Sequence, residues 1–367
     1  MPRPNRASSV TSTLTVADRF RGMLLGTAVG DSVGLPAEGI SPRRARKLFG
    51  DRWRQQLVFN RGMVSDDTEH TLFVAQSLLV HPTSSQRFAR RLAWCLRWWL
   101  MSLPAGVGLA TLRAIVRLWL GFKPTRSGVR SAGNGPAMRS ALIGAFFATQ
   151  PDRMDDYLTA ATTITHTDPR ALTGAKAVAY LAAWTIRENP EHAPPLGAVL
   201  ELLRAAGPHD EEWLTLLASI ADAHDQRQSV EAFADRLGLG RGVTGYAYHT
   251  VPVVIYAWLR HFGDFEETLS AVLNCGGDTD TTGAIVGALA GGVVGHQGIP
   301  PLWVERLADW PRGSRLLTAV AARLADTAQD RRPTRPVPYF WPAVIPRNLL
   351  FLVIVLLHGL RRLAPPY

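Results

Sequence analysis

Residues 274–295 read NCGGDTDTTGAIVGALAGGVVG, and this stretch decides the fold class. Asp278 and Asp280 stand two positions apart after a Gly-Gly pair, and the apolar residues that follow recur at the three- and four-residue steps of an α-helix. Most of these residues are Gly, Ala or Val, so a neighbouring backbone can approach the helix closely. We therefore expect an acidic segment at the start of a closely packed helix.

The same helical period recurs along the chain, whereas the strict alternation of strands joined by tight Asn-Gly or Asp-Gly turns is missing. Helical runs are expected at 20–30, 70–80, 88–100, 109–120, 171–186, 212–223 and 281–294. The sequence thus predicts an all-α protein, a single compact multi-helix domain with a C-terminal apolar helical appendage. The expected division is a disordered N-terminus at 1–16, the helical domain at 17–326, a Pro- and Arg-rich linker at 327–346 and an apolar segment at 347–367.

Composition narrows the class of function. The 367 residues carry a formal net charge of +10, and a basic surface attracts phosphate. Nearly all of this charge is scattered arginine, the lysines being Lys47, Lys123 and Lys176, and no RNA-binding motif or zinc finger accompanies it. The sequence therefore argues against nucleic acid as a direct partner. Two distant cysteines, Cys95 and Cys275, and an N-terminus without an apolar signal segment indicate a cytoplasmic protein.

Two acidic segments carry the expected chemistry. SDDTE at 65–69 precedes one helical run, and DTD at 278–280 precedes another. Ser, Thr and Asp often cap helix starts, and capping is the alternative interpretation of each segment alone. One capping Asp per helix suffices, however. If the two starts meet, four aspartates repel one another by on the order of a few kcal/mol per pair, and bound cations remove that cost.

The ligand types select the class of metal. All candidate ligands are oxygens, which favour Mg²⁺, Mn²⁺ or Ca²⁺ over zinc or copper. They are Ser65, Asp66, Asp67, Asp278, Asp280 and Thr281. Four carboxylates match the charge of two divalent ions, and neither segment has the layout of an EF-hand. We therefore predict a site for two divalent ions.

Three further segments suit a ligand site. A Gly-rich run at 22–38 ends on Glu38, although helix packing through glycine explains it equally well. RSAGNGPAMR at 130–139 is a loop that enters a helix, where free backbone N–H groups suit a diphosphate, but the same letters make ordinary turns. THTDP at 165–169 contains His166, and a lone histidine there is more often a neighbour of a helix cap than a catalyst.

Together these segments resemble the ADP-ribosylglycohydrolase family, which includes the dinitrogenase reductase-activating glycohydrolase and the ADP-ribosyl-acceptor hydrolases. The matching stretches, in the family's order, are RFRGMLLGTAVGDSVGLPAEG (19–39), SDDTEHT (65–71), SAGNGPAMR (131–139), THTDP (165–169) and NCGGDTDTTGAIVGALAGGVVG (274–295). The paired SDDT and GGDTDT motifs are the specific ones. The resemblance covers the chain from about residue 19 to about residue 310.

The resemblance implies an all-helical hydrolase with two Mg²⁺ ions, or Mn²⁺, at the floor of a cleft. The implied metal ligands are Glu38, Ser65, Asp66, Asp67, Asp278, Asp280 and Thr281. The implied contacts to ADP-ribose are Arg130, Ser131, Gly133, Asn134, Gly135 and His166. The family hydrolyses the bond between ribose C1″ and an acceptor, so an ADP-ribosylated protein or small-molecule conjugate is the expected substrate. Ser65 stands where Thr is more usual, and Ala132 where some relatives have an aromatic residue.

Cleavage at C1″ develops oxocarbenium character on the ribose, and a carboxylate usually activates the water. We expect Asp67 in this acid–base role, with Glu38 as the second choice. Two alternatives stay open. One is a non-catalytic ADP-ribose-binding or structural protein of the same fold, and the more distant one is a Mg²⁺-dependent diphosphate enzyme of the prenyl-transfer type.

The C-terminal segment lies outside the resemblance. Residues 349–357 read LLFLVIVLL, and Arg361-Arg362 follow shortly after. A membrane span needs about 20 apolar residues, so this run alone is too short. One expectation is a helix docked on the protein's own body or on a second copy, and the other is peripheral membrane contact through 349–360.

Overall fold

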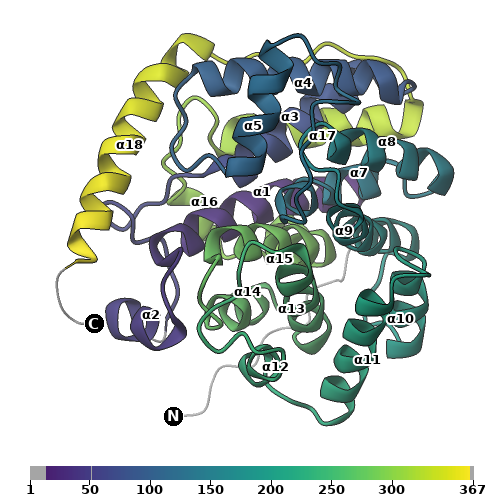
Figure 1. The fold of residues 1–367 in the computed structure, drawn as a ribbon, viewed down its shortest axis with the longest axis vertical. Coiled ribbons are helices and arrows are strands. Elements are labelled where there is room, and N and C mark those ends of the chain that lie inside the picture. Colours follow the sequence, from purple (N-terminus) through teal and green to yellow (C-terminus); the bar gives the residue numbers. More distant parts are fainter. Residues whose placement is uncertain (1–13, 51, 364–367) are drawn as a thin grey trace.

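The computed structural model describes residues 14–50 and 52–363, and their regular secondary structure is helical throughout, with isolated backbone bridges between loops (Figure 1). The α-helices are α1 (Val16–Gly34), α2 (Pro42–Phe49), α3 (Asp66–Val80), α4 (Ser85–Met101), α5 (Leu109–Trp119), α6 (Gly135–Met138), α7 (Ala141–Phe146), α8 (Pro151–Thr163), α9 (Pro169–Glu188), α10 (Leu196–Arg204), α11 (Glu211–Asp225), α12 (Val230–Arg236), α13 (Ala247–Arg260), α14 (Phe265–Leu273), α15 (Thr279–Val294), α16 (Pro301–Glu305), α17 (Ser314–Asp330) and α18 (Val344–Arg361). Short 3₁₀ turns are η1 (Leu35–Ala37), η2 (His296–Gly298) and η3 (Trp341–Ala343). The prediction of an all-α fold with an apolar C-terminal helix is confirmed.

The two central helices, α1 and α15, meet backbone to backbone. A Cβ atom placed on Gly30 would lie 1.9 Å from the carbonyl oxygen of Gly283, a distance that no side chain tolerates. Three more positions of α1 face α15 in the same way: Gly22 opposite Gly291, Gly26 opposite Gly287 and Gly34 opposite Thr279. The expected close approach of the glycine-rich helix is therefore present, and its partner is the Gly-rich N-terminal run.

The other helices surround this pair (Figure 1). Helix α3 packs against α1, α4 and α17, while α13 and α14 pack against α15. One continuous core of buried apolar side chains joins these helices. As a result, the first turn of α3 and the first turn of α15 are held at the same place by the packing of α1 against both helices.

The predicted boundaries at the two ends of the chain can be compared with the helices that the structure has there. The prediction of disorder for 1–16 falls mainly on residues 1–13, which lie outside the described residues, and α1 begins at Val16 with Thr15 as its cap. At the other end, α17 continues to Asp330. The following stretch lies along the body, where Val337 and Gln76 exchange two hydrogen bonds of 2.9 Å. The boundaries of domain, linker and appendage stay predictions.

Candidate functional site

A cleft of about 720 Å³ opens where α3 and α15 begin. Predicted metal ligands line one part of it: Glu38, Ser65, Asp66, Asp278, Asp280 and Thr281. Predicted substrate contacts line another part: Ser131, Gly133, Asn134, Gly135 and His166. Asp67 is only 1% exposed, and Arg130 is exposed but is not among the lining residues. Segments from five parts of the sequence thus converge on one cleft.

The carboxylate of Asp67 joins the two acidic segments. Ser65 caps α3, because its hydroxyl accepts a hydrogen bond from the backbone N–H of Asp67 at 3.2 Å. The same hydroxyl is 3.0 Å from Asp67 Oδ2 and donates to it. Thr281, in the first turn of α15, donates to this oxygen from the other side at 3.2 Å. The two helix starts therefore meet, as the charge argument supposed.

Capping does not account for the other carboxylates. Asp278 is the cap residue of α15 by position, yet its side chain makes no capping hydrogen bond. It accepts instead from Asn134 Nδ2 at 2.6 Å. Asp67 Oδ1 and Asp280 Oδ1 are buried and have no hydrogen-bond partner among the described residues. A buried acceptor left in this way costs about 1–3 kcal/mol, more when it is charged, and a bound cation would satisfy both oxygens.

The acidic site is electrostatically strained without added positive charge. Burial raises the pKa of Asp66, Asp67 and Asp280 well above the usual range. Neighbouring carboxylates raise these pKa values further, with Asp31 acting on Asp66, Asp66 on Asp67 and Glu38 on Asp280. Within residues 14–50 and 52–363, no group of three or more His, Cys, Asp or Glu side chains is arranged to hold a metal ion as it stands.

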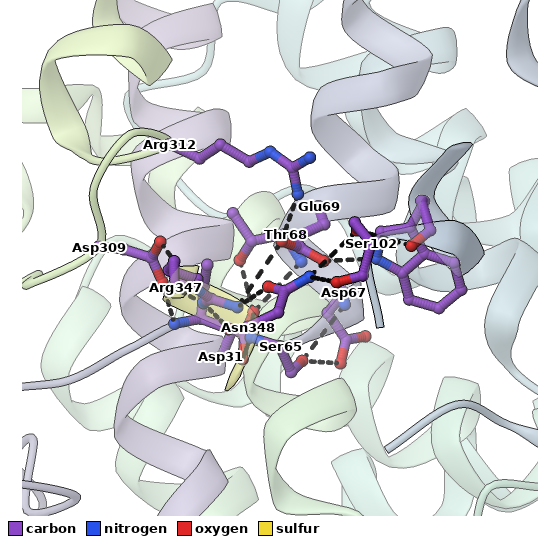
Figure 2. A network of polar contacts seen from close by, with 12 residues as sticks. Asp31, Ser65, Asp67, Thr68, Glu69, Ser102, Asp309, Arg312, Arg347 and Asn348 are labelled. Carbon is purple, nitrogen blue, oxygen red and sulfur yellow. Dashed lines mark hydrogen bonds and ion pairs between the residues drawn. The ribbon is translucent and has the colours of Figure 1, made fainter. Parts of the chain in front are cut away.

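Asp31 is a site residue to which the sequence analysis assigned no role. It lies in the middle of α1 and is fully buried, and both of its oxygens accept from the backbone N–H of Ser65 at 3.0 Å. Thr68 donates to it from the backbone at 3.2 Å and from the hydroxyl at 2.5 Å (Figure 2). Burial raises the pKa of Asp31 to about 7. The signal available in the sequence was a single acid inside the Gly-rich, otherwise apolar run of α1.

Glu69 belongs to a buried ion-pair network beside the cleft and does not line it. Its carboxylate pairs with Arg312, accepts from Trp99 Nε1 at 2.5 Å and lies 3.7 Å from Arg347 Nη1 (Figure 2). Arg347 also pairs with Asp309. These arginines pair with Glu69, although its charge still contributes to the raised pKa of Asp66.

The glycine loop at 131–135 lies against His166. A Cβ atom on Gly133 would be 3.0 Å from His166 Nε2, and one on Gly135 would be 3.2 Å from His166 Cε1. The other ring nitrogen, Nδ1, hydrogen-bonds the hydroxyl of Thr165 at 2.8 Å. Burial lowers the pKa of His166 to about 3, so the ring is neutral at pH 7. The loop and the histidine therefore form one compact polar wall of the cleft.

Residues 241–245 form part of the rim and were missed by the sequence reasoning. The carbonyl oxygen of Gly245 accepts from the backbone N–H of Asn134 at 2.9 Å, and Val243 O accepts from the N–H of Asp278 at 2.8 Å. Gly277 has a φ of +82°, and a Cβ atom there would lie 2.0 Å from Val243 O. Gly277 is therefore required where this turn presses against the 241–245 segment, whereas the preceding Gly276, with a φ of +63°, faces Ile40 and Pro42.

Helix α18 contributes to the cleft from outside the predicted domain. Phe351 and Val355 line the cleft. Arg362 donates to the carbonyl oxygens of Pro36 and Glu38, each at 2.6 Å, and His358 hydrogen-bonds the carbonyl oxygen of Pro36 at 2.9 Å. The backbone of the Glu38 turn is therefore held by the C-terminal helix, while the Glu38 side chain remains exposed in the cleft.

Comparison with known proteins gives a consistent picture. The ADP-ribosylglycohydrolase family profile matches residues 12–334. An uncharacterized protein of Archaeoglobus fulgidus is 33% identical over 301 residues, covering 80% of this chain and 92% of that protein. The ADP-ribosyl-[dinitrogen reductase] glycohydrolase of Rhodospirillum rubrum is 28% identical over 306 residues, covering 80% and 91%. Human ADP-ribosylhydrolase ARH3 is 27% identical over 331 residues, covering 78% and 88%. A solved structure described as an ADP-ribosylglycohydrolase-related protein complex aligns with a TM-score of 0.59 and 27% identity, covering 85% of this chain and 99% of that chain.

Proposed function

This chain belongs to the ADP-ribosylglycohydrolase family, whose enzymes hydrolyse glycosidic bonds of ADP-ribosyl groups, and we propose that it does so with two divalent metal ions. The proposed substrate is an ADP-ribosylated protein or small-molecule conjugate, and the proposed product is free ADP-ribose. One observation carries the proposal above the others. Asp280, which lines the cleft, and Asp67, which is buried against the lining residues Ser65 and Thr281, present carboxylate oxygens without partners among the described residues.

The donor set fits hard divalent cations. The residues that would hold two Mg²⁺ or Mn²⁺ ions are Glu38, Ser65, Asp66, Asp67, Asp278, Asp280 and Thr281. Such ions supply positive charge and a Lewis acid for the ribose oxygens. Their charge would also offset the mutual repulsion that raises the pKa values of Asp66, Asp67 and Asp280.

The wall made by residues 131–135 and His166 suits the ADP-ribose moiety. The neutral ring of His166 has one nitrogen bonded to Thr165 and the other, Nε2, beside Gly133, so it can exchange a hydrogen bond with a ribose hydroxyl. Asn134 lines the cleft, as a ligand contact would, and it also contacts a metal-ligand candidate. Its Nδ2 donates to Thr250 Oγ1 at 2.9 Å and to Asp278 Oδ2, so Asn134 positions Asp278.

Exposure favours Glu38 over Asp67 as the acid–base group. Asp67 is enclosed by the hydroxyls of Ser65 and Thr281, whereas the Glu38 side chain reaches the solvent of the cleft. In the proposed reaction Glu38 accepts a proton from a water molecule, the hydroxide forms a bond to ribose C1″, and the bond from C1″ to the acceptor breaks. The acceptor leaves with a proton taken from the solvent, and Glu38 releases the proton that it accepted to the solvent. This reverses the order in which the sequence ranked the two carboxylates.

A panel of defined ADP-ribosyl conjugates tests the proposal. Arginine-linked, serine-linked and nucleobase-linked conjugates are incubated with the full chain in Mg²⁺, in Mn²⁺ and in EDTA, and free ADP-ribose is quantified by chromatography. We expect turnover of at least one conjugate with metal and none in EDTA. Full turnover in EDTA would contradict the metal proposal, and ADP-ribose binding without turnover of any conjugate would favour the non-catalytic alternative.

We also place the activity in the cytoplasm, a proposal supported by the free thiols of Cys95 and Cys275.

A further inference from the structure

Helix α18 is oriented with its polar side toward the protein. Arg347 and Asn348 are buried in its first turns, where Arg347 Nη2 donates to Val64 O at 2.6 Å and Asn348 Nδ2 donates to Ser102 O at 2.8 Å. Near the other end of α18, His358 and Arg362 hydrogen-bond backbone carbonyl oxygens of the Glu38 turn. The polar residues of α18 are therefore used in docking, and this arrangement leaves its apolar side facing outward.

The outward side of α18 is apolar along its whole length. Its exposed large aliphatic residues are between 38% and 62% exposed: Ile345, Leu349, Leu350, Leu352, Val353, Leu356, Leu357 and Leu360. The stretch Trp341–Arg361 is long and apolar enough to cross a membrane by length and composition, with 22% of its most apolar window buried. A surface helix normally turns such residues toward the core, so this side requires a partner in water.

Exposed tryptophans of α4 and α5 extend this surface. A groove of about 840 Å³ is lined by Trp94 and Trp98 of α4 together with Trp341 and Ile345 at the start of the C-terminal helix. The ring of Trp98 makes an edge contact with that of Trp119 of α5, with centroids 6.0 Å apart. Figure 1 shows α18 down the left side of the molecule and α4 and α5 near its top. We call the exposed apolar residues of these three helices the outer apolar face.

The segments that build the outer apolar face are purely cationic. Residues 81–130 contain nine Arg and Lys and no Asp or Glu, and residues 331–363 contain six Arg and again no acid. Elsewhere in the chain acidic residues outnumber Lys and Arg, so the net positive charge of the protein resides in these two segments. On α5, exposed Arg113 stands between exposed Leu109 and Val116, and on α18 exposed Arg361 follows Leu360.

We propose that the outer apolar face docks the protein on an anionic lipid bilayer. Aliphatic side chains, tryptophans with an apolar body and a polar tip, and arginines that reach lipid phosphates are the combination that suits the interface of a membrane. The helix lies in the plane of that interface, because its Arg347 and Asn348 stay bonded to the body. A second copy is a poorer occupant, since a two-fold contact places this cationic face against itself. The proposal goes beyond the hydrolase activity and does not depend on it.

Flotation with vesicles tests the proposal on the full chain. Vesicles of phosphatidylcholine, with and without a quarter of phosphatidylglycerol, are mixed with the protein at low and high salt. We expect co-flotation with the anionic vesicles, ~tenfold weaker binding to neutral vesicles, and release at high salt. Val353→Glu, which alters an outward residue that is 52% exposed, is expected to weaken binding ~tenfold or more because a charge enters the apolar contact. The matched control, Val16→Glu, alters a residue that is 46% exposed at the start of α1 and should change binding less than about twofold.

Two further measurements keep the test decisive. Trp98→Ala removes an aromatic ring of α4 and should also weaken vesicle binding, which covers the case in which Val353→Glu fails to fold. The circular dichroism spectrum and the thermal unfolding of each variant check folding. The proposal is overturned if the folded full chain does not bind vesicles in which a quarter of the lipid is anionic. It is also overturned by a dimer in light scattering without lipid that Val353→Glu dissociates, because the face would then be an interface between copies.

Discussion

The hydroxyl of Thr281 donates a hydrogen bond to Asp67 Oδ2 across 3.2 Å, although the two residues are 214 positions apart in the chain. This contact ties the first turn of α15 to the first turn of α3. It leaves the second oxygen of Asp67 buried and without a partner among the described residues, close to the carboxylates that line the cleft. The effects expected from altering the site follow from this arrangement.

Removing a carboxylate from the floor should abolish activity while sparing the fold. Asp280→Ala deletes a buried, unpartnered acid, so it removes an expected metal ligand and also relieves charge repulsion. We expect loss of metal-dependent turnover with an unfolding temperature in metal-free buffer that is unchanged or higher. The control Asp225→Ala removes an acid whose side chain is 78% exposed. Calorimetric titration with Mn²⁺ should show lost binding for the first variant only, and equal Mn²⁺ affinity in both would contradict this assignment.

A side chain at Gly135 should damage the ADP-ribose wall more than the metal site. Its Cβ would lie 3.2 Å from His166 Cε1, so the larger branches of Gly135→Val must displace the histidine ring. We expect weaker ADP-ribose binding, by ~tenfold or more, with Mn²⁺ affinity nearly unchanged. Gly197→Val is the matched control, because nothing lies within 4 Å of a Cβ there. Equal ADP-ribose affinity of both variants in calorimetry would refute the placement of the ligand.

The stabilising effect of metal should grow with pH. Carboxyls with raised pKa values in the folded state stabilise it below their unfolded pKa, near 4, and this stability is lost as the pH rises through the folded values. For Asp31 that value is about 7, and the pKa values of Asp66, Asp67 and Asp280 are also raised. Divalent ions compete with these protons, so the rise in unfolding temperature on adding Mg²⁺ should be larger at pH 8 than at pH 5. A rise independent of pH would argue against metal at these carboxylates.

Arg362 should affect turnover, whereas its neighbour should not. Arg362→Ala removes the hydrogen bonds that hold the carbonyl oxygens of Pro36 and Glu38, so the Glu38 turn loses its support. We expect kcat on a soluble conjugate to fall several-fold with Mn²⁺ affinity much less changed. Arg361→Ala alters an exposed arginine and should leave kcat unaffected. Equal kcat values for the two variants would show that α18 does not position the Glu38 turn.

Local period predicts the helical runs at α1, α3, α4, α5, α9, α11 and α15, and ligand chemistry points to the two acidic segments and the glycine loop, because both are visible in neighbouring residues. Other helices, such as α13 and α17, were not among the predicted runs. The role of Asp31 and the pairing of Glu69 with Arg312 were not predictable in this way, since the partners lie far apart in the chain. The orientation of α18 was also hidden. Periodicity identifies an apolar side, which in a surface helix normally faces the core. In α18 the ion pair between Arg347 and Asp309 holds the polar side toward the protein, so the apolar side faces outward.

The backbone contact between α1 and α15 also determines when this protein can complete its fold during synthesis. Gly30 and Gly283 touch, yet more than 250 residues must be synthesised between them. At about 5–20 residues per second on the ribosome, the first acidic segment exists for roughly 10–50 seconds before its partner is made. Throughout that interval the glycine side of α1 has no partner helix, and the cleft lacks the residues at the start of α15. Uptake of the proposed metal ions would therefore wait for the last quarter of synthesis or later, and a nascent chain truncated before α15 would leave the glycine side of α1 uncovered.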